Sequence, residues 1–124
     1  MGGDRERTLR ARRLRQVADQ LKAAGSLVDA LSALRTLADE EGHVLGPDSH
    51  EGLGTRAEIA AILVSLGDLE GARRELEALI PAVERLLGPL DPLLVQLHAL
   101  RDVVSRRIAR NLDVERSMDD EVGA

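Results

Sequence analysis

A repeat of 42 residues constrains the fold of this chain more than any other feature of its sequence. The segment Val44-Leu-Gly-Pro-Asp48 returns as Leu86-Leu-Gly-Pro-Leu90. A fixed period in this range is typical of stacked repeats, in which each unit buries its apolar face against its neighbours. We therefore expect an array that presents a surface and does no chemistry. The same offset pairs further residues: Val17 with Ile59, Ala18 with Ala60, Leu21 with Leu63, Gly25 with Gly67, Leu27 with Leu69, Ala30 with Ala72, Leu34 with Leu76 and Leu37 with Leu79.

The composition favours helices over strands. The 124 residues suffice for one domain, and 44% of them are hydrophobic although Phe, Tyr and Trp are all absent. Leu and Ala favour helices, whereas the aromatic residues that favour strands are missing, so we predict an all-α fold. Without aromatic side chains the protein also lacks stacking platforms for bases and the usual interface hot spots. Any binding should therefore depend on Leu, Arg and carboxylates.

Hydrophobic periodicity predicts five helices, and breaker residues mark the turns between them. Gly25 and Gly67 end the first and third helices, and Ser26 and Asp68 stand where N-caps of the following helices should be. Turns this short indicate antiparallel helix pairs. The expected helices span about residues 5–24, 27–41, 51–66, 69–87 and 92–111.

Proline marks two further positions. Asp91-Pro92 is a strong signal for the start of a helix, whereas Pro81 lies inside the fourth helix and should bend or split it. The loop at residues 42–50 is rich in breakers. We expect a helical repeat domain at residues 1–112, followed by an acidic, flexible tail at residues 113–124.

Charge is distributed unevenly although the net charge is only −5. Residues 1–16 carry six arginines against two carboxylates, and residues 113–124 carry five carboxylates against one arginine. Opposed ends suggest head-to-tail attraction or different partners for the two ends, but two solvated ends explain the pattern as well, and we favour that explanation. There is no cysteine, no secretory signal and no apolar run long enough for a membrane span, so we expect a cytoplasmic protein.

The repeat resembles a tetratricopeptide repeat. In that family small residues at the crossing of two helices let them approach closely, and Ala60 and Ala72 take these positions here, with Gly67-Asp68-Leu69 as the turn. The Leu-Gly-Pro segment and the 42-residue period look like the kinesin-light-chain subtype found in bacterial arrays. The resemblance covers residues 11–90 as two repeats and leaves one further helix. That helix resembles a solvated cap, because Arg101 and Asp102 replace the apolar and small residues expected there.

The resemblance implies a right-handed superhelix that binds protein or peptide segments on its concave face. A mixed-charge groove of this kind suits a segment with acidic and small apolar residues. The family's carboxylate clamp is not expected, because the matching positions mix charges and lack Asn. The expected concave face comprises Arg12, Arg15, Gln16, Asp19 and Lys22 of the first helix, Glu58, Ala61, Val64 and Ser65 of the third, and Gln96, Ala99, Val103 and Arg107 of the last.

The last helix offers a second candidate surface. Its apolar stripe is wider than one neighbouring helix needs, so part of it could form an interface with a second copy or a partner. The alternative is that these residues pack on both sides of the fourth helix. The stripe consists of Leu93, Leu94, Leu97, Leu100, Val103, Val104 and Ile108.

Three functions remain open from the sequence. The first is an adaptor that binds another protein or a peptide, and the second is a subunit that forms a homodimer through its last helix. In the third, weaker one, arginines of the first helix contact nucleic acid, although acidic partners on neighbouring helices would explain these arginines better. The arginines concerned are Arg5, Arg7, Arg12 and Arg15.

We expect no catalytic site, no cofactor and no metal. The serines have no visible His and Asp partners, and the Gly52-Leu-Gly54 segment lacks the lysine and the strand of a phosphate loop. His43 and His50 lie near carboxylates, but their spacing matches no established zinc pattern.

Overall fold

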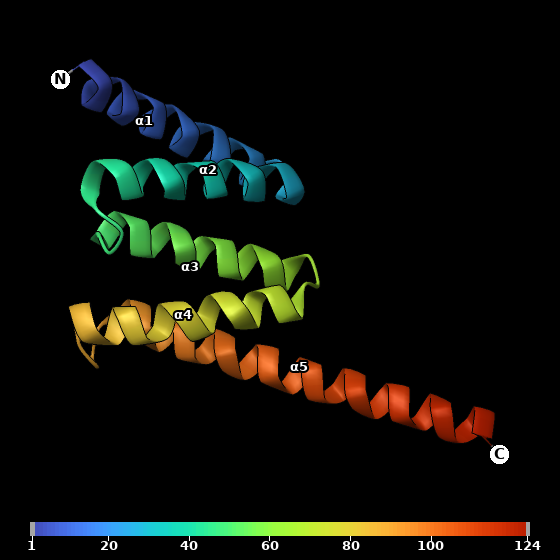
Figure 1. Cartoon of the computed structure of the whole chain (residues 1–124). Coiled ribbons are helices and arrows are strands. Elements are labelled where there is room, and N and C mark those ends of the chain that lie inside the picture. Colours follow the sequence, from blue (N-terminus) through green and yellow to red (C-terminus); the bar gives the residue numbers. More distant parts are fainter. Residues whose placement is uncertain (1, 124) are drawn as a thin grey trace.

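Five α-helices and no strand make up the part of the chain that the computed structural model describes, residues 2–123 (Figure 1). Met1 and Ala124, the outer ends of the two predicted regions, lie outside it. The all-α prediction is confirmed. The helices are α1 (Gly2–Ala23), α2 (Leu27–Leu45), α3 (His50–Ser65), α4 (Leu69–Leu87) and α5 (Pro92–Gly123).

The helices stack in chain order. Each packs against the next, and α3 also contacts α5 (Figure 1). The chain reverses at each turn, so α1–α2 and α3–α4 form two antiparallel pairs and α5 follows as a single helix (Figure 1). This arrangement is that of an all-α helical repeat. It puts the first helices of the two pairs, α1 and α3, in equivalent places in the repeat.

Glycine at two repeated positions makes the short turns possible. Gly25 and Gly67 follow the first helix of each pair with φ of 77° and 82°, and Gly46 and Gly88 follow the second helix with φ of 96° and 91°. Residues with a Cβ rarely adopt this left-handed conformation, so the 42-residue spacing of these glycines repeats the turns along with the helices.

Polar side chains cap the helices after these turns. The Asp68 carboxylate accepts a hydrogen bond from the Gly71 N–H at 2.9 Å, and the Asp91 carboxylate accepts one from the Leu93 N–H at 2.9 Å. Ser49, which precedes α3, accepts one from the Gly52 N–H at 3.0 Å. Ser26 precedes α2 as expected but makes no side-chain capping bond. These bonds use N–H groups that have no partner within a helix.

The core repeats with the sequence. Ala18, Ala30, Ala60 and Ala72 are each 0% exposed, which fits the prediction that small residues lie where the paired helices approach closely. Around them the paired leucines are also buried, and each contributes about 1.5–3 kcal/mol by leaving water. These leucines are Leu34, Leu37, Leu76 and Leu79.

The helices differ from the expectations at three points. First, α2 continues to Leu45, so the connection to α3 is shorter than the loop expected at residues 42–50. Second, α4 has the predicted bounds and is one continuous helix through Pro81, so the proline does not split it; the alternative, a bend at Pro81, stays a prediction. Third, α5 does not end near residue 111 but continues to Gly123, because no breaker interrupts helix-favouring residues there. The predicted flexibility of residues 113–124 stays a prediction.

Candidate partner-binding groove

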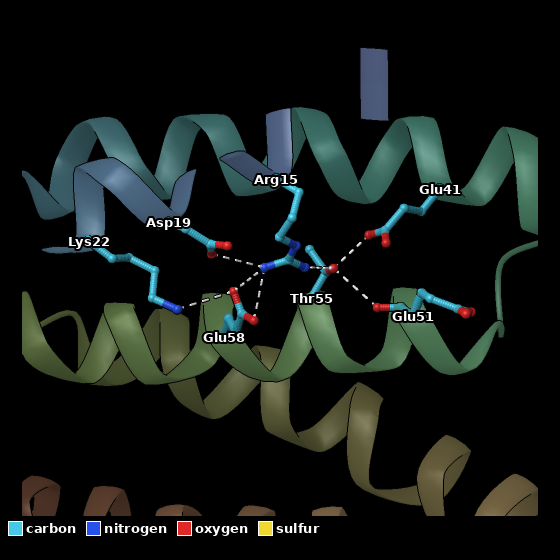
Figure 2. Close-up of polar contacts among 7 residues, drawn as sticks. All are labelled: Arg15, Asp19, Lys22, Glu41, Glu51, Thr55 and Glu58. Carbon is cyan, nitrogen blue, oxygen red and sulfur yellow. Dashed lines mark hydrogen bonds and ion pairs between the residues drawn. The ribbon is translucent and has the colours of Figure 1, made fainter. Parts of the chain in front are cut away.

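Arg15 is the centre of a polar network that links the first three helices (Figure 2). From α1 its guanidinium donates through Nη1 to both carboxylate oxygens of Glu58 on α3, at 2.9 and 2.8 Å. Lys22 Nζ lies 3.4 Å from Glu58 Oε2, and Asp19 Oδ1 lies 3.6 Å from Arg15 Nη1. The network brings four predicted concave-face residues together: Arg15, Asp19, Lys22 and Glu58.

Thr55 extends this network into the core. Its hydroxyl accepts a hydrogen bond from Arg15 Nη2 at 2.7 Å and donates to Glu41 Oε1 of α2 at 2.6 Å, with the Glu51 carbonyl 3.1 Å away as a second acceptor. Thr55 is fully buried and Glu41 is only 7% exposed. A buried carboxylate requires such a donor, because it has lost its hydration. The contacts therefore hold α1, α2 and α3 in one arrangement (Figure 2).

Burial and the charge of Glu58 shift the pKa of Arg15 in opposite directions. Burial is the largest influence and lowers the pKa of Arg15, but the hydrogen bond and charge of Glu58, with the charges of Asp19 and Glu41, raise it above its ordinary value overall. A cation whose pKa is raised by folding stabilises the folded state below its unfolded pKa and loses this contribution only as the pH rises through the folded pKa. Arg15 therefore keeps its charge and its contacts throughout the neutral range.

Two hollows lie on either side of the Arg15–Glu58 pair. Arg15 lines the larger, which has a volume of about 610 Å³, and Glu58 lines the smaller, of about 290 Å³. We call the two hollows together the α1–α3 groove and the larger one the N-terminal cleft. The walls of the N-terminal cleft include Ala11, Leu37, Val44 and Leu45, with the charged residues Arg12, Arg15, Glu41 and Glu51 among them. The smaller hollow is lined by Lys22, Leu27, Glu58, Ala61, Ile62 and Ser65.

The groove contains most of the concave-face residues predicted on α1 and α3. Arg12, Arg15 and Gln16 line the N-terminal cleft, and Lys22, Glu58, Ala61 and Ser65 line the smaller hollow. Val64 was also expected on the concave face, but it is only 8% exposed and belongs to the core. Its side chain packs within the fold, so it is not available to a partner.

The residues predicted on α5 do not join this groove. Gln96, Ala99 and Arg107 are exposed and Val103 is half-buried, but none of them lines either hollow. That these four residues contact a partner stays a prediction.

The apolar stripe of α5 is largely part of the core. Leu94, Leu97 and Val104 are 2%, 2% and 1% exposed, because α5 packs against both α4 and α3. These three residues were candidates for an interface, but their burial leaves them unavailable to a second copy or a partner. Leu93, Leu100 and Ile108 are partly buried against the same core. The stripe is wide because it contacts two helices and not one.

Arginines of α1 form ion pairs with carboxylates on neighbouring helices, as the sequence suggested. Besides the Arg15–Glu58 pair, Arg7 Nη1 lies 3.7 Å from Glu40 Oε2 of α2. Arg12 is exposed, and no ion pair of the described residues involves it. The opposite side of the stack has its own link between the two pairs, where Arg35 Nη1 of α2 lies 3.2 Å from Glu75 Oε1 of α4.

Residues 2–123 contain no group of three or more His, Cys, Asp or Glu side chains placed to hold a metal ion. His43 and His50 in particular are exposed and belong to no such group. Along the same residues no helix is both long and apolar enough to cross a membrane.

Sequence reasoning missed Thr55 and Glu41 as parts of the Arg15 network. A signal for Thr55 was present, because it lies four residues before Ile59 and seven before Ile62, on the buried stripe of α3. A hydroxyl on that stripe needs partners. No comparable signal pointed to Glu41, whose burial depends on how α3 packs against α2.

A scan against models of known protein families finds no match to this chain, and neither does a search of curated proteins.

Proposed function

We propose that this protein is a non-enzymatic interaction module, similar to the 42-residue tetratricopeptide repeats, that binds a segment of another protein in the α1–α3 groove. The observation that carries the proposal is the pair of hollows on either side of the Arg15–Glu58 contact, lined by residues of α1 and α3 together with residues of α2. Concave sites with apolar walls and a few placed charges are typical binding sites.

The walls of the groove define the chemistry of the segment. Ala11, Val44 and Leu45 form an apolar surface in the N-terminal cleft that suits a branched aliphatic side chain. Arg12 stands beside this surface with its charge exposed, so it favours a carboxylate next to the apolar residue. The segment therefore carries an apolar side chain with acidic neighbours.

The smaller hollow continues the site along the same two helices. Its lining includes Lys22 and two small side chains, Ala61 and Ser65, that let a bound backbone approach closely. The bound segment would extend from one hollow to the other across the Arg15–Glu58 pair. Because this pair already ties α1 to α3, the groove is shaped before the segment arrives, which lowers the entropic cost of binding.

Selection from a random peptide library on the immobilised protein tests this function. We expect enriched sequences in which an aliphatic residue has acidic neighbours, and we expect Arg12→Glu or Ala61→Glu to weaken their binding about tenfold or more. Arg74→Glu is the matched control, because Arg74 is exposed on α4 and lines neither hollow. Equal weakening by all three variants, or no enrichment at all, would contradict the proposal.

A further inference from the structure

The last part of α5 is exposed along its whole length. From residue 109 to residue 121 every side chain is exposed, and Ile108 is the last residue of α5 that packs against the core. Figure 1 shows this part of α5 projecting beyond the other four helices. We call residues 109–121 the α5 extension. At 1.5 Å per residue it is about 20 Å of bare helix.

The α5 extension combines acidic and apolar side chains. It carries five carboxylates against two arginines, Arg110 and Arg116. Three large apolar residues also lie in the open, because Leu112 is 54%, Val114 is 52% and Met118 is 60% exposed. A helix without tertiary contacts is marginal in water at this length, so covering these side chains would stabilise it.

The N-terminal cleft has the complementary features. Its apolar walls suit aliphatic side chains such as those of the extension, and the helix beside it carries six arginines within residues 1–16. Arg12 lies in the cleft, is exposed and has no ion pair among the described residues. Apolar contact would supply affinity, and the opposed charges would set the orientation.

The two surfaces cannot meet within one molecule. The N-terminal cleft lies where α2 turns into α3, whereas the α5 extension leaves the stack on the opposite side (Figure 1). Since α5 is one continuous helix from Pro92 to Gly123, the extension cannot fold back without breaking it. A contact between them must therefore join two copies.

We propose that the α5 extension of one copy docks in the N-terminal cleft of a second copy, with Leu112, Val114 or Met118 against the apolar walls and the carboxylates near Arg12 and its neighbouring arginines. The proposal rests on the proposed function, because it names a segment that the α1–α3 groove binds. The contact is heterologous, since different surfaces of the two copies meet, so copies join head to tail.

The charges make the association sensitive to salt. Exposed ion pairs are screened beyond about 10 Å at 0.1 M salt, so we expect the dissociation constant to rise about tenfold or more between about 0.05 M and 0.5 M NaCl. One short helix buries less surface than a standard interface, so association should require micromolar concentrations or higher.

Mixing two variants of the full chain tests the contact. Arg12→Glu damages the cleft and leaves the extension intact, whereas the double variant Leu112→Glu with Met118→Glu damages the extension and leaves the cleft intact. All three side chains are exposed, so far-ultraviolet circular dichroism should confirm unchanged folding. In sedimentation velocity, wild type should associate, each variant alone should be monomeric, and their equimolar mixture should form a two-chain complex. Arg74→Glu should associate like wild type.

Other outcomes would overturn the proposal. Association that survives Arg12→Glu but not the double variant would indicate a symmetric contact between two α5 helices. A monomeric wild type at several hundred micromolar in low salt, or a mixture that stays monomeric, would exclude the head-to-tail contact. If the groove still binds library-selected peptides in that case, only this inference fails and the proposed function stands.

Discussion

Helices α1 and α3 hold equivalent places in the repeat but have different environments. Val17 on α1 is 45% exposed, whereas its partner Ile59 on α3 is 3% exposed. Leu21 and Leu63 differ in the same direction, because Leu21 is half-buried and Leu63 is buried. The residues that face the paired helix do not differ, since Ala18 and Ala60 are both fully buried.

The difference follows from the neighbours of each helix. Helix α3 packs between α2, α4 and α5, whereas α1 packs against α2 alone and reaches α3 only through side chains such as Arg15. The same apolar pattern is therefore fully covered in the middle of the stack and partly open at its end. The α1–α3 groove lies where side chains bridge the two helices without filling the space between them.

The largest effect should come from placing a charge at Ile59, and the same change at the equivalent Val17 should have little effect. Ile59→Asp would place an unpaired carboxylate in the core and should cost about 4 kcal/mol or more, enough to unfold a marginal domain. Val17→Asp at the equivalent position should cost less than about 0.5 kcal/mol, because it remains solvated. Urea unfolding followed by circular dichroism measures both. Similar costs for the two variants would mean that α1 is covered as well as α3.

Truncating two equivalent buried leucines, one in each helix pair, should lower the free energy of unfolding by equal amounts, and by less than Ile59→Asp. Leu34 and Leu76 are 0% and 1% exposed, so Leu34→Ala and Leu76→Ala should each lower the free energy of unfolding by about 2–5 kcal/mol. Chemical denaturation gives both values directly. If Leu34→Ala costs far less than Leu76→Ala, the end of the stack relaxes around the cavity and the two pairs are not equivalent inside.

Breaking the polar bridge, by which Thr55 of α3 joins Arg15 of α1 to Glu41 of α2, should lower the free energy of unfolding by less again. Thr55→Val removes the hydroxyl that bonds Arg15 and the buried Glu41, and we expect a loss of about 1–3 kcal/mol. Thr36→Val is the control, since the exposed Thr36 hydroxyl bonds only the Ser32 carbonyl of its own helix, at 3.2 Å. Thermal unfolding of both variants compares them. A harmless Thr55→Val would show that water replaces the hydroxyl and that the bridge does not hold α1 in place.

The smallest effect should come from an ion pair within one helix. Arg73 pairs with Glu70 and Glu77 on the exposed side of α4, at 2.7 and 3.1 Å, and spans no gap between helices. Arg73→Ala should leave the melting temperature unchanged within error, because solvent screens exposed pairs. A clear drop in the melting temperature would show that surface charge, and not the contact between helices, gives Arg15 its importance.

Local signals in the sequence were sufficient for the elements and for much of the groove. The 42-residue offset predicted the buried positions, and Gly25 and Gly67 predicted the turns, because both depend on residues close along the chain. The resemblance to a tetratricopeptide repeat, and not the offset itself, implied that Arg15 and Glu58 lie on one face. Their direct bond could not be predicted, because the two residues are 43 positions apart in sequence and the bond depends on the reach of side chains between two helices.

The predictions for α5 were less successful, for two physical reasons. The burial of Leu94, Leu97 and Val104 depends on the simultaneous packing of α5 against α3 and α4, which periodicity cannot give. The helix also continues past residue 111 without an apolar stripe to mark it, because residues such as Glu115, Arg116 and Met118 favour helix by themselves.

Backbone amide chemical shifts would test the binding role of the α1–α3 groove most directly. A library-selected peptide should be titrated into the isotopically labelled full chain. We expect the largest shift changes to cluster at residues lining the two hollows, such as Arg12, Lys22, Ala61 and Ser65, and we expect Arg12→Glu to make these changes smaller. Changes centred on the opposite side of the stack, around Arg35 and Glu75, would contradict it.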